Sequence, residues 1–167
     1  MSQFNAADIK KDRLRFTKNK ASSVLILLSI AANALYFVSI YSSDVGGSYY
    51  RFFILLSIVY NLVFMLSAFL ASEGIKNYKL SYAYTSILLG ALQVGRIFII
   101  PLQAHHEPNP VVNAQALPVM SGGQFRYVTA CLLISAALLV CAGVIGIQKT
   151  TVLNRYQAEL DRVKREG

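Results

Sequence analysis

The chain has 167 residues, of which 55% are hydrophobic and only 14% are charged, and its net charge is +8. A water-soluble surface needs more charge than this, so the composition excludes an ordinary soluble domain. The positive charge does not indicate nucleic acid binding, because the basic residues flank apolar stretches and form no basic face with groups that read or stack on bases. We therefore expect a membrane protein with no nucleic acid partner.

The first segment, residues 1–22, is strongly basic. Two acidic residues, Asp8 and Asp12, reduce its charge slightly. Its basic residues are Lys10, Lys11, Arg13, Arg15, Lys18 and Lys20. Because each basic residue beside an anionic membrane contributes about 1 kcal/mol of attraction, we expect this segment to contact anionic lipid headgroups.

Four apolar stretches follow, each about twenty residues long and therefore able to cross a bilayer as a helix. They cover residues 23–41, 52–72, 82–101 and 127–148. The first is too long for the apolar part of a signal peptide and reads as a retained helix. We predict an all-α membrane protein, a four-transmembrane-helix bundle made of two hairpins.

The basic residues are distributed unevenly among the connections. They gather before the first stretch, between the second and third, and after the fourth, whereas connections 42–51 and 102–126 hold only Arg51 and Arg126. The positive-inside rule then places both termini in the cytoplasm and these two connections outside. Because the chain is small and has few long loops, we expect its location to be the bacterial cytoplasmic membrane.

Asn33 and Asn61 lie near the middle of the first and second stretches. Lipid offers an amide no hydrogen bond at that depth, so both side chains should turn inward. Two interpretations remain open: hydrogen bonds that hold helices together, or a polar pathway for transport.

The third stretch carries a stripe of small and polar residues, Tyr82, Ser86, Gly90, Gln93 and Arg96, at helical spacing. Gln93 is also near the midplane, so it should converge with the two asparagines of the first helices. We predict an intramembrane polar cluster of Asn33, Asn61, Gln93 and Arg96.

Arg96 is the strongest anomaly, since a cation inside a membrane span indicates a functional site by default. Three alternatives are open: its side chain snorkels to the outer headgroups, bonds to amides and carbonyls of this chain, or pairs with an acidic residue of another subunit. No span contains Asp or Glu at this depth, and only Asp44 and Glu107 are placed to neutralise Arg96 within the chain.

Small residues four apart allow membrane helices to approach closely. Such pairs are Ser86 with Gly90, Ala91 with Gly95, and Ala142 with Gly146. The third stretch has two pairs on neighbouring faces. Either both pack within the bundle, or one of them contacts a partner chain.

The connection 102–126 is rich in Pro and Gly, which argues against a helix or sheet, yet it is apolar enough to pack on the helix ends or lie among the outer headgroups. Its residues His105, His106 and Glu107 are the only cluster with metal-ligand chemistry. Adjacent residues in an extended loop point apart, so we predict no metal site.

Residues 149–167 are expected to continue the fourth helix as a cytoplasmic amphipathic tail, because no Pro or Gly interrupts it before Gly167. Its apolar seam consists of Leu153, Tyr156, Leu160 and Val163. A seam this short is suited to docking on a larger cytoplasmic surface or on the membrane.

No catalytic constellation stands out, and no cofactor motif is present. Cys131 and Cys141 lie about 15 Å apart along one helix, too far for a disulfide, and are interpreted as inert packing thiols. We therefore predict a non-catalytic accessory or scaffolding subunit of a larger integral membrane complex, such as a transporter. The alternative is a small homo-oligomeric transporter or channel with a polar midplane pathway, and a membrane enzyme ranks third.

Overall fold

The protein is seen here as a computed structural model that describes residues 12–41, 48–106 and 120–166. Within these residues the chain is all-helical, with the helices α2 (Lys20–Tyr41), α3 (Ser48–Lys76), α4 (Leu80–Ile99), α5 (Pro101–His106) and α6 (Gly122–Glu166). Four of them, α2, α3, α4 with α5, and α6, are long and apolar enough to span a membrane. This architecture is typical of an α-helical membrane protein.

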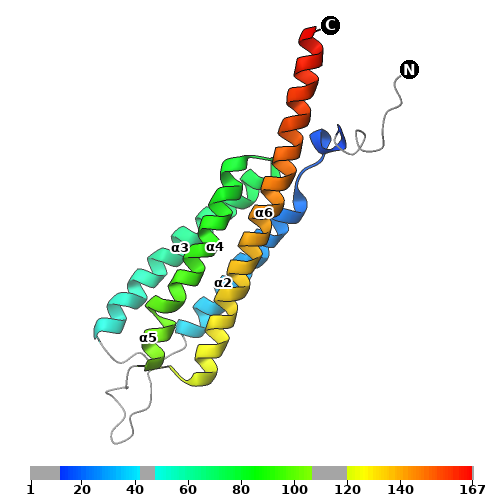
Figure 1. Ribbon diagram of the computed structural model, residues 1–167. Coiled ribbons are helices and arrows are strands. Elements are labelled where there is room, and N and C mark those ends of the chain that lie inside the picture. The colour runs from blue at the N-terminus through cyan, green and yellow to red at the C-terminus, as the bar shows by residue number, and fades with distance from the viewer. Residues whose placement is uncertain (1–11, 42–47, 107–119, 167) are drawn as a thin grey trace, which may run out of the picture.

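The four long helices lie side by side (Figure 1). Helix α6 has the most extensive contacts, with α4 and α2, while α3 packs on α2 and less extensively on α4. The start of α2, the α3–α4 connection and the C-terminal part of α6 lie at one end, which we term the basic end. Helix α5 lies at the opposite end, termed the loop end.

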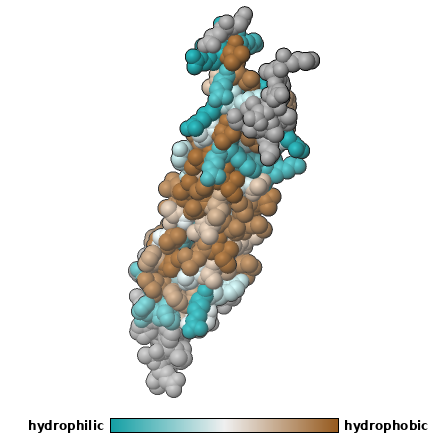
Figure 2. Space-filling model, turned by 45° about the vertical axis from the view of Figure 1, so that its right-hand side comes forward, coloured by the Kyte–Doolittle hydropathy of each residue, from teal (hydrophilic) through white to brown (hydrophobic). Residues whose placement is uncertain are grey.

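The surface of the molecule is divided into zones. Figure 2 shows a broad hydrophobic belt between two more hydrophilic ends. Large apolar side chains such as Leu62, Leu88 and Phe98 are exposed in this belt. Exposed apolar side chains in such numbers are unfavourable in water and favourable in lipid, which agrees with the length of the helices.

Small residues bring α4 and α6 close together. The hydroxyl of Ser86 donates to the carbonyl oxygen of Leu139 at 2.8 Å. A Cβ atom on Gly90 would lie 3.1 Å from the carbonyl oxygen of Ala136, and one on Gly143 would lie 2.8 Å from that of Ala83. Glycine at these two positions therefore permits backbone contact between the helices.

The predicted packing residues divide into two groups. Ser86, Gly90, Ala142 and Gly146 are buried within the protein, whereas Ala91 and Gly95 are exposed on the outer face of α4. The first group serves the contacts between the helices of this chain. The pair Ala91 and Gly95 does not.

Two apolar clusters fill the space between the helices. The basic-end cluster contains Ile26, Phe64, Ala68, Ala71, Ile75, Ala83, Leu89, Leu139 and Ala142. The loop-end cluster contains Tyr36, Ile40, Ile100, Ala104, Met120, Val128, Cys131 and Leu132. The core is therefore built from mostly small and aliphatic side chains from every long helix.

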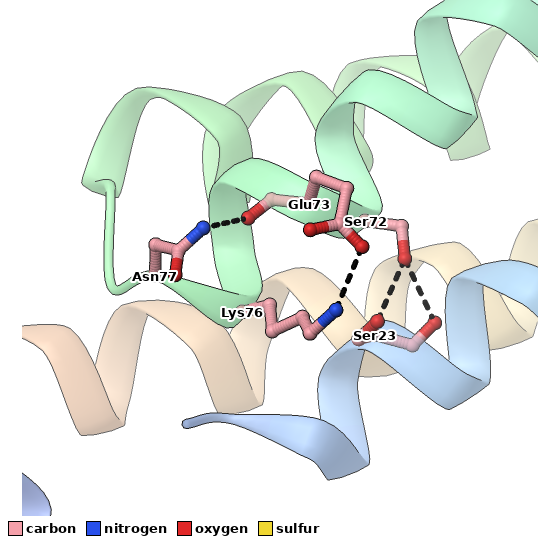
Figure 3. Close-up of polar contacts among 5 residues, drawn as sticks. All are labelled: Ser23, Ser72, Glu73, Lys76 and Asn77. Atoms are coloured by element: carbon pink, nitrogen blue, oxygen red, sulfur yellow. Dashed lines mark hydrogen bonds and ion pairs between the residues drawn. The ribbon is translucent and has the colours of Figure 1, made fainter. Parts of the chain in front are cut away.

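Polar contacts fasten α2 to α3 at the basic end (Figure 3). The hydroxyls of Ser23 and Ser72 are 2.8 Å apart, and Ser72 also donates to the carbonyl of Ser23. The amide of Asn77 donates to the carbonyl of Glu73 at 2.8 Å, which satisfies an acceptor at the end of α3. A further bond joins the residue before α2 to the end of α3, since the backbone N–H of Asn19 donates to the carbonyl of Lys76 at 3.0 Å.

The prediction that connection 102–126 contains no helix is wrong at both of its ends. Residues 101–106 form α5, and α6 begins at Gly122. Pro101 is the first residue of α5, where its missing N–H has no partner to lose. Ser121 caps α6, because its hydroxyl accepts from the backbone N–H of Gln124 at 3.2 Å. The remainder of the connection, 107–119, lies outside the described residues.

The close approach of α4 to α6 makes a prediction about stability. Gly143→Ala should lower the free energy of unfolding by about 1–2 kcal/mol, because the added methyl group meets a backbone carbonyl that cannot easily move. Gly95→Ala is the matched control, since nothing lies within 4 Å of its added Cβ, and it should change stability by less than about 0.5 kcal/mol. Detergent denaturation followed by circular dichroism measures both. Similar values for the two variants would contradict the described packing.

Candidate functional site

Polar side chains from all four long helices meet in the interior. Helix α2 contributes Asn33, α3 contributes Ser57 and Asn61, α4 contributes Gln93 and Arg96, and α6 contributes Ser135. All six are buried. We term these six residues the polar cluster; it contains each of the four residues predicted to converge.

The amides of the polar cluster bond to one another. Asn33 Nδ2 donates to Asn61 Oδ1 at 3.1 Å. Gln93 Nε2 donates to Asn33 Oδ1 at 3.0 Å and to Ser135 Oγ at 3.2 Å. Ser135 in turn donates to the carbonyl of Ser29 at 3.0 Å. The chain of bonds thus links α2, α3, α4 and α6.

Arg96 is bound by neutral oxygen atoms. Its Nη1 donates to Asn33 Oδ1 at 3.1 Å and to Asn61 Oδ1 at 2.8 Å, and its Nη2 donates to Ser57 Oγ at 2.8 Å. Arg96 is only 4% exposed. Three alternatives were open for Arg96: snorkelling, hydrogen bonds within the chain, or an acidic partner on another subunit. The described contacts are hydrogen bonds within the chain and do not match snorkelling.

Two aromatic rings also contact the guanidinium group. Its central carbon lies 4.3 Å from the centroid of Tyr36 and 4.8 Å from that of Tyr60. A cation over an aromatic face is stabilised by about 2 kcal/mol when both are withdrawn from water. The electron-rich faces of these rings therefore stabilise the positive charge of Arg96, which has no carboxylate partner among the described residues.

The charge of Arg96 has no acidic partner in the described part of the chain. The acidic residues whose side chains are described are Asp12, Glu73, Glu159 and Asp161, and none of them is a hydrogen-bond partner of Arg96. The two residues proposed from the sequence to neutralise it, Asp44 and Glu107, lie outside the described residues. The site as described thus keeps a net positive charge.

The polar cluster is enclosed by apolar residues along the helix axes. On α2, Asn33 lies between Ile26 of the basic-end cluster and Ile40 of the loop-end cluster. Leu89 on α4 and Ile100, the residue that follows α4, flank Gln93 and Arg96 in the same manner. Apolar side chains therefore flank the polar cluster on both sides along α2 and α4.

A groove reaches Arg96 from the side. It is a cavity of about 220 Å³ between α3 and α4, lined by Leu56, Ser57, Tyr60, Leu92, Gly95, Arg96, Ile99 and Ile100. We term it the α3/α4 groove. Its rim residues Leu56, Leu92 and Ile99 are about half exposed, so the groove opens onto the hydrophobic belt. Because Gly95 has no side chain, nothing from that position covers the neighbouring Arg96.

Sequence reasoning did not identify Tyr60 or Ser135 as part of this site. Tyr60 lies three residues after Ser57, and Ser135 lies at the centre of the fourth apolar stretch. The spacing of Tyr60 relative to Ser57 is the signal that would have placed both on one face of α3. Ser135 carried no comparable signal, since a single serine in an apolar helix is common.

The predicted docking seam on the tail of α6 is only partly available. Leu153 and Tyr156 are buried, whereas Leu160 and Val163 are exposed. The N-terminal helical residues 12–16 lie beside this part of α6 (Figure 1), and Arg15 lines a hollow with Gln157, Leu160 and Asp161. Half of the seam, Leu153 and Tyr156, is thus covered within the described part of the chain.

The other sequence candidates make local contacts. His105 stacks on Phe125 with a centroid distance of 4.7 Å, and His106 Nδ1 bonds to the carbonyl oxygen of Leu102 at 2.8 Å. No metal-binding group of three His, Cys, Asp or Glu residues occurs among the described residues. Cys131 and Cys141 are both free thiols.

Comparison of the chain with protein-family models, with curated proteins and with solved structures finds no match. The interpretation of the site therefore rests on its geometry and chemistry.

The stacking of Arg96 on Tyr36 can be tested with two substitutions. Tyr36→Phe should change the free energy of unfolding by less than about 0.5 kcal/mol, because the ring is kept and the buried hydroxyl has no hydrogen-bond partner among the described residues. Tyr36→Leu should lower it by about 2 kcal/mol, because the aromatic face is lost. Unfolding in detergent measures both, and an equal loss for the two variants would show that the hydroxyl, not the ring, stabilises Arg96.

Proposed function

We propose that the chain is a non-catalytic multi-pass membrane protein that serves as an accessory or scaffolding subunit of a larger integral membrane complex. The observation that carries this proposal is the α3/α4 groove. It is an indentation in the hydrophobic belt lined by the small residue Gly95, and a second exposed small residue, Ala91, lies one helical turn away on α4. Small residues on an exposed helix face allow a second helix to approach closely.

The conformation gives less support to transport by a polar pathway. A pathway needs polar groups that continue toward both ends of the membrane. Along α2 and α4 the polar cluster is instead flanked by large apolar side chains, Ile26 and Leu89 on one side and Ile40 and Ile100 on the other. The polar side chains are therefore better suited to fixing the helices than to lining a channel.

We further propose that both termini are cytoplasmic and that the membrane is the bacterial cytoplasmic membrane. The basic end holds Lys20, Lys76, Lys79 and Lys149, and the positive-inside rule assigns such an end to the cytoplasm. The described N-terminal residues Arg13, Arg15 and Lys18 lie near this end. Their charge is suited to anionic lipid headgroups, as expected from the sequence.

Topology can be measured with single cysteines in a variant that lacks Cys131 and Cys141. Gly123→Cys near the loop end should react with a membrane-impermeant thiol reagent added to intact cells. Ala158→Cys on the tail of α6 should react only after the membrane is opened, because charge bias places it inside. Both positions are exposed, so burial does not limit labelling. The reverse pattern would overturn the proposed orientation.

The accessory role predicts that a partner depends on the α3/α4 groove. Purification of the tagged chain from its own host in mild detergent should yield a stoichiometric integral membrane partner, and Gly95→Leu should abolish its recovery by filling the groove. Ala137→Leu is the control, since Ala137 is an exposed residue of α6 that does not line the groove. A pure homo-oligomer that moves solute in liposomes, or a partner retained equally by both variants, would contradict the role.

A further inference from the structure

The charge on Arg96 specifies what the α3/α4 groove binds. We propose that the groove accepts a transmembrane helix of a different protein, and that a carboxylate on this helix pairs with Arg96. The inference rests on the proposed accessory role and names the chemistry of the partner. It extends the hydrogen-bonded site into an intermolecular ion pair.

The first argument is charge complementarity. The three acceptors of Arg96 in the described chain are neutral, namely Asn33 Oδ1, Asn61 Oδ1 and Ser57 Oγ. Neutral acceptors and aromatic rings reduce the cost of a buried cation but leave its charge in place. A carboxylate is the group that would neutralise it, and a paired charge is far more favourable inside a membrane than an unpaired one.

The second argument is that Arg96 still has hydrogen-bonding capacity. A guanidinium group has five N–H donors. Toward the described residues, Arg96 uses two donors on Nη1 and one on Nη2. One N–H of Nη2 and the N–H of Nε remain, which is sufficient for one carboxylate. Such charge-assisted bonds are about twice as strong as neutral ones.

The third argument is access. Arg96 lines the α3/α4 groove, and a Cβ atom added to the adjacent Gly95 would contact nothing within 4 Å. The cavity of about 220 Å³ is larger than the roughly 150 Å³ that holds a benzene molecule in another protein. It therefore has room for one or two side chains of a helix that lies against α3 and α4.

A carboxylate within a membrane span cannot come from a second copy of this chain. Asp44 and Glu107 lie in the connections outside the predicted spans, and apart from Glu73 at the basic end the sequence has no other Asp or Glu from residue 13 to residue 158. A second copy docked at this depth would also bring its own Arg96, and two like charges repel. The partner helix must therefore belong to a different protein.

Depth favours a side chain over a lipid headgroup. Arg96 lies five residues before Pro101, which corresponds to about 8 Å along the helix. A lipid phosphate lies at the membrane boundary, whereas a helix can place a carboxylate at any depth. The apolar rim of the groove, with Leu56, Leu92 and Ile99, is suited to the aliphatic surface of such a helix.

The test uses purified full-length chain in phosphatidylcholine vesicles and synthetic transmembrane peptides. Each peptide is a Leu/Ala helix of about 20 residues with one variable position about 8 Å from its outer end. Binding is measured by energy transfer between labelled peptide and labelled chain at mildly alkaline pH. The peptide with Glu at this position should bind about tenfold more tightly than the one with Gln. A peptide with Glu near its opposite end should bind no better than the Gln peptide.

Three variants locate the effect. Gly95→Leu keeps Arg96 in place but fills the groove, so it should remove the preference for Glu. Arg96→Gln removes the charge and should also remove the preference, and circular dichroism establishes that the variant is folded. Arg96→Lys keeps the charge but loses the planar fork, so its preference for Glu should be reduced.

Equal binding of the Glu and Gln peptides to the wild type would overturn the proposal. Retention of the Glu preference in Gly95→Leu would overturn it as well. Loss of peptide binding when phosphatidylglycerol is included in the same vesicles would assign the groove to anionic lipid instead. The accessory role and the ion pair can fail independently. If the purification yields a partner that depends on Gly95 but the peptides show no preference for Glu, the accessory role stands and only the ion pair is rejected.

Discussion

The structure depends on how one positive charge is accommodated away from water. Arg96 is buried, and its donors are met by oxygen atoms from α2 and α3 while two tyrosine rings cover the guanidinium group. This single requirement fixes the rotation of three helices, because each must present a particular polar or aromatic residue at the same depth. The remaining contacts, including the bond from Gln93 to Ser135, extend the same constraint to α6.

Helix packing distinguishes the two sides of α4. Its inner face, with Ser86 and Gly90, contacts α6 so closely that added atoms would meet backbone. Its outer face, with Ala91 and Gly95, is equally small but contacts no helix of the described chain. Since α3 and α4 contact each other less extensively than the other neighbouring pairs of long helices, a gap remains between them beside Arg96. The polar interior and the binding surface proposed for this protein therefore share two residues, Ser57 and Arg96.

Much of this could be predicted from the sequence, because lipid imposes simple rules. Four apolar stretches of sufficient length predicted the four long helices, and amides at midplane depth predicted the convergence of Asn33, Asn61 and Gln93. Other features depend on contacts between distant residues, which periodicity does not reveal. The burial of Tyr156 on α6 and the contact of Tyr60 with Arg96 are of this kind. Helix α5 was missed because Pro at a first helical position resembles Pro in a loop.

The order of these residues along the chain has a consequence for biosynthesis. Every described group that contacts the guanidinium of Arg96, from Asn33 and Tyr36 on α2 to Ser57, Tyr60 and Asn61 on α3, precedes it in the sequence. When α4 leaves the ribosome, the residues that supply its acceptors have already been synthesised. The charged helix can therefore be integrated against a prepared surface before α6 has been synthesised, and α6 then closes a core whose most unfavourable group is already satisfied.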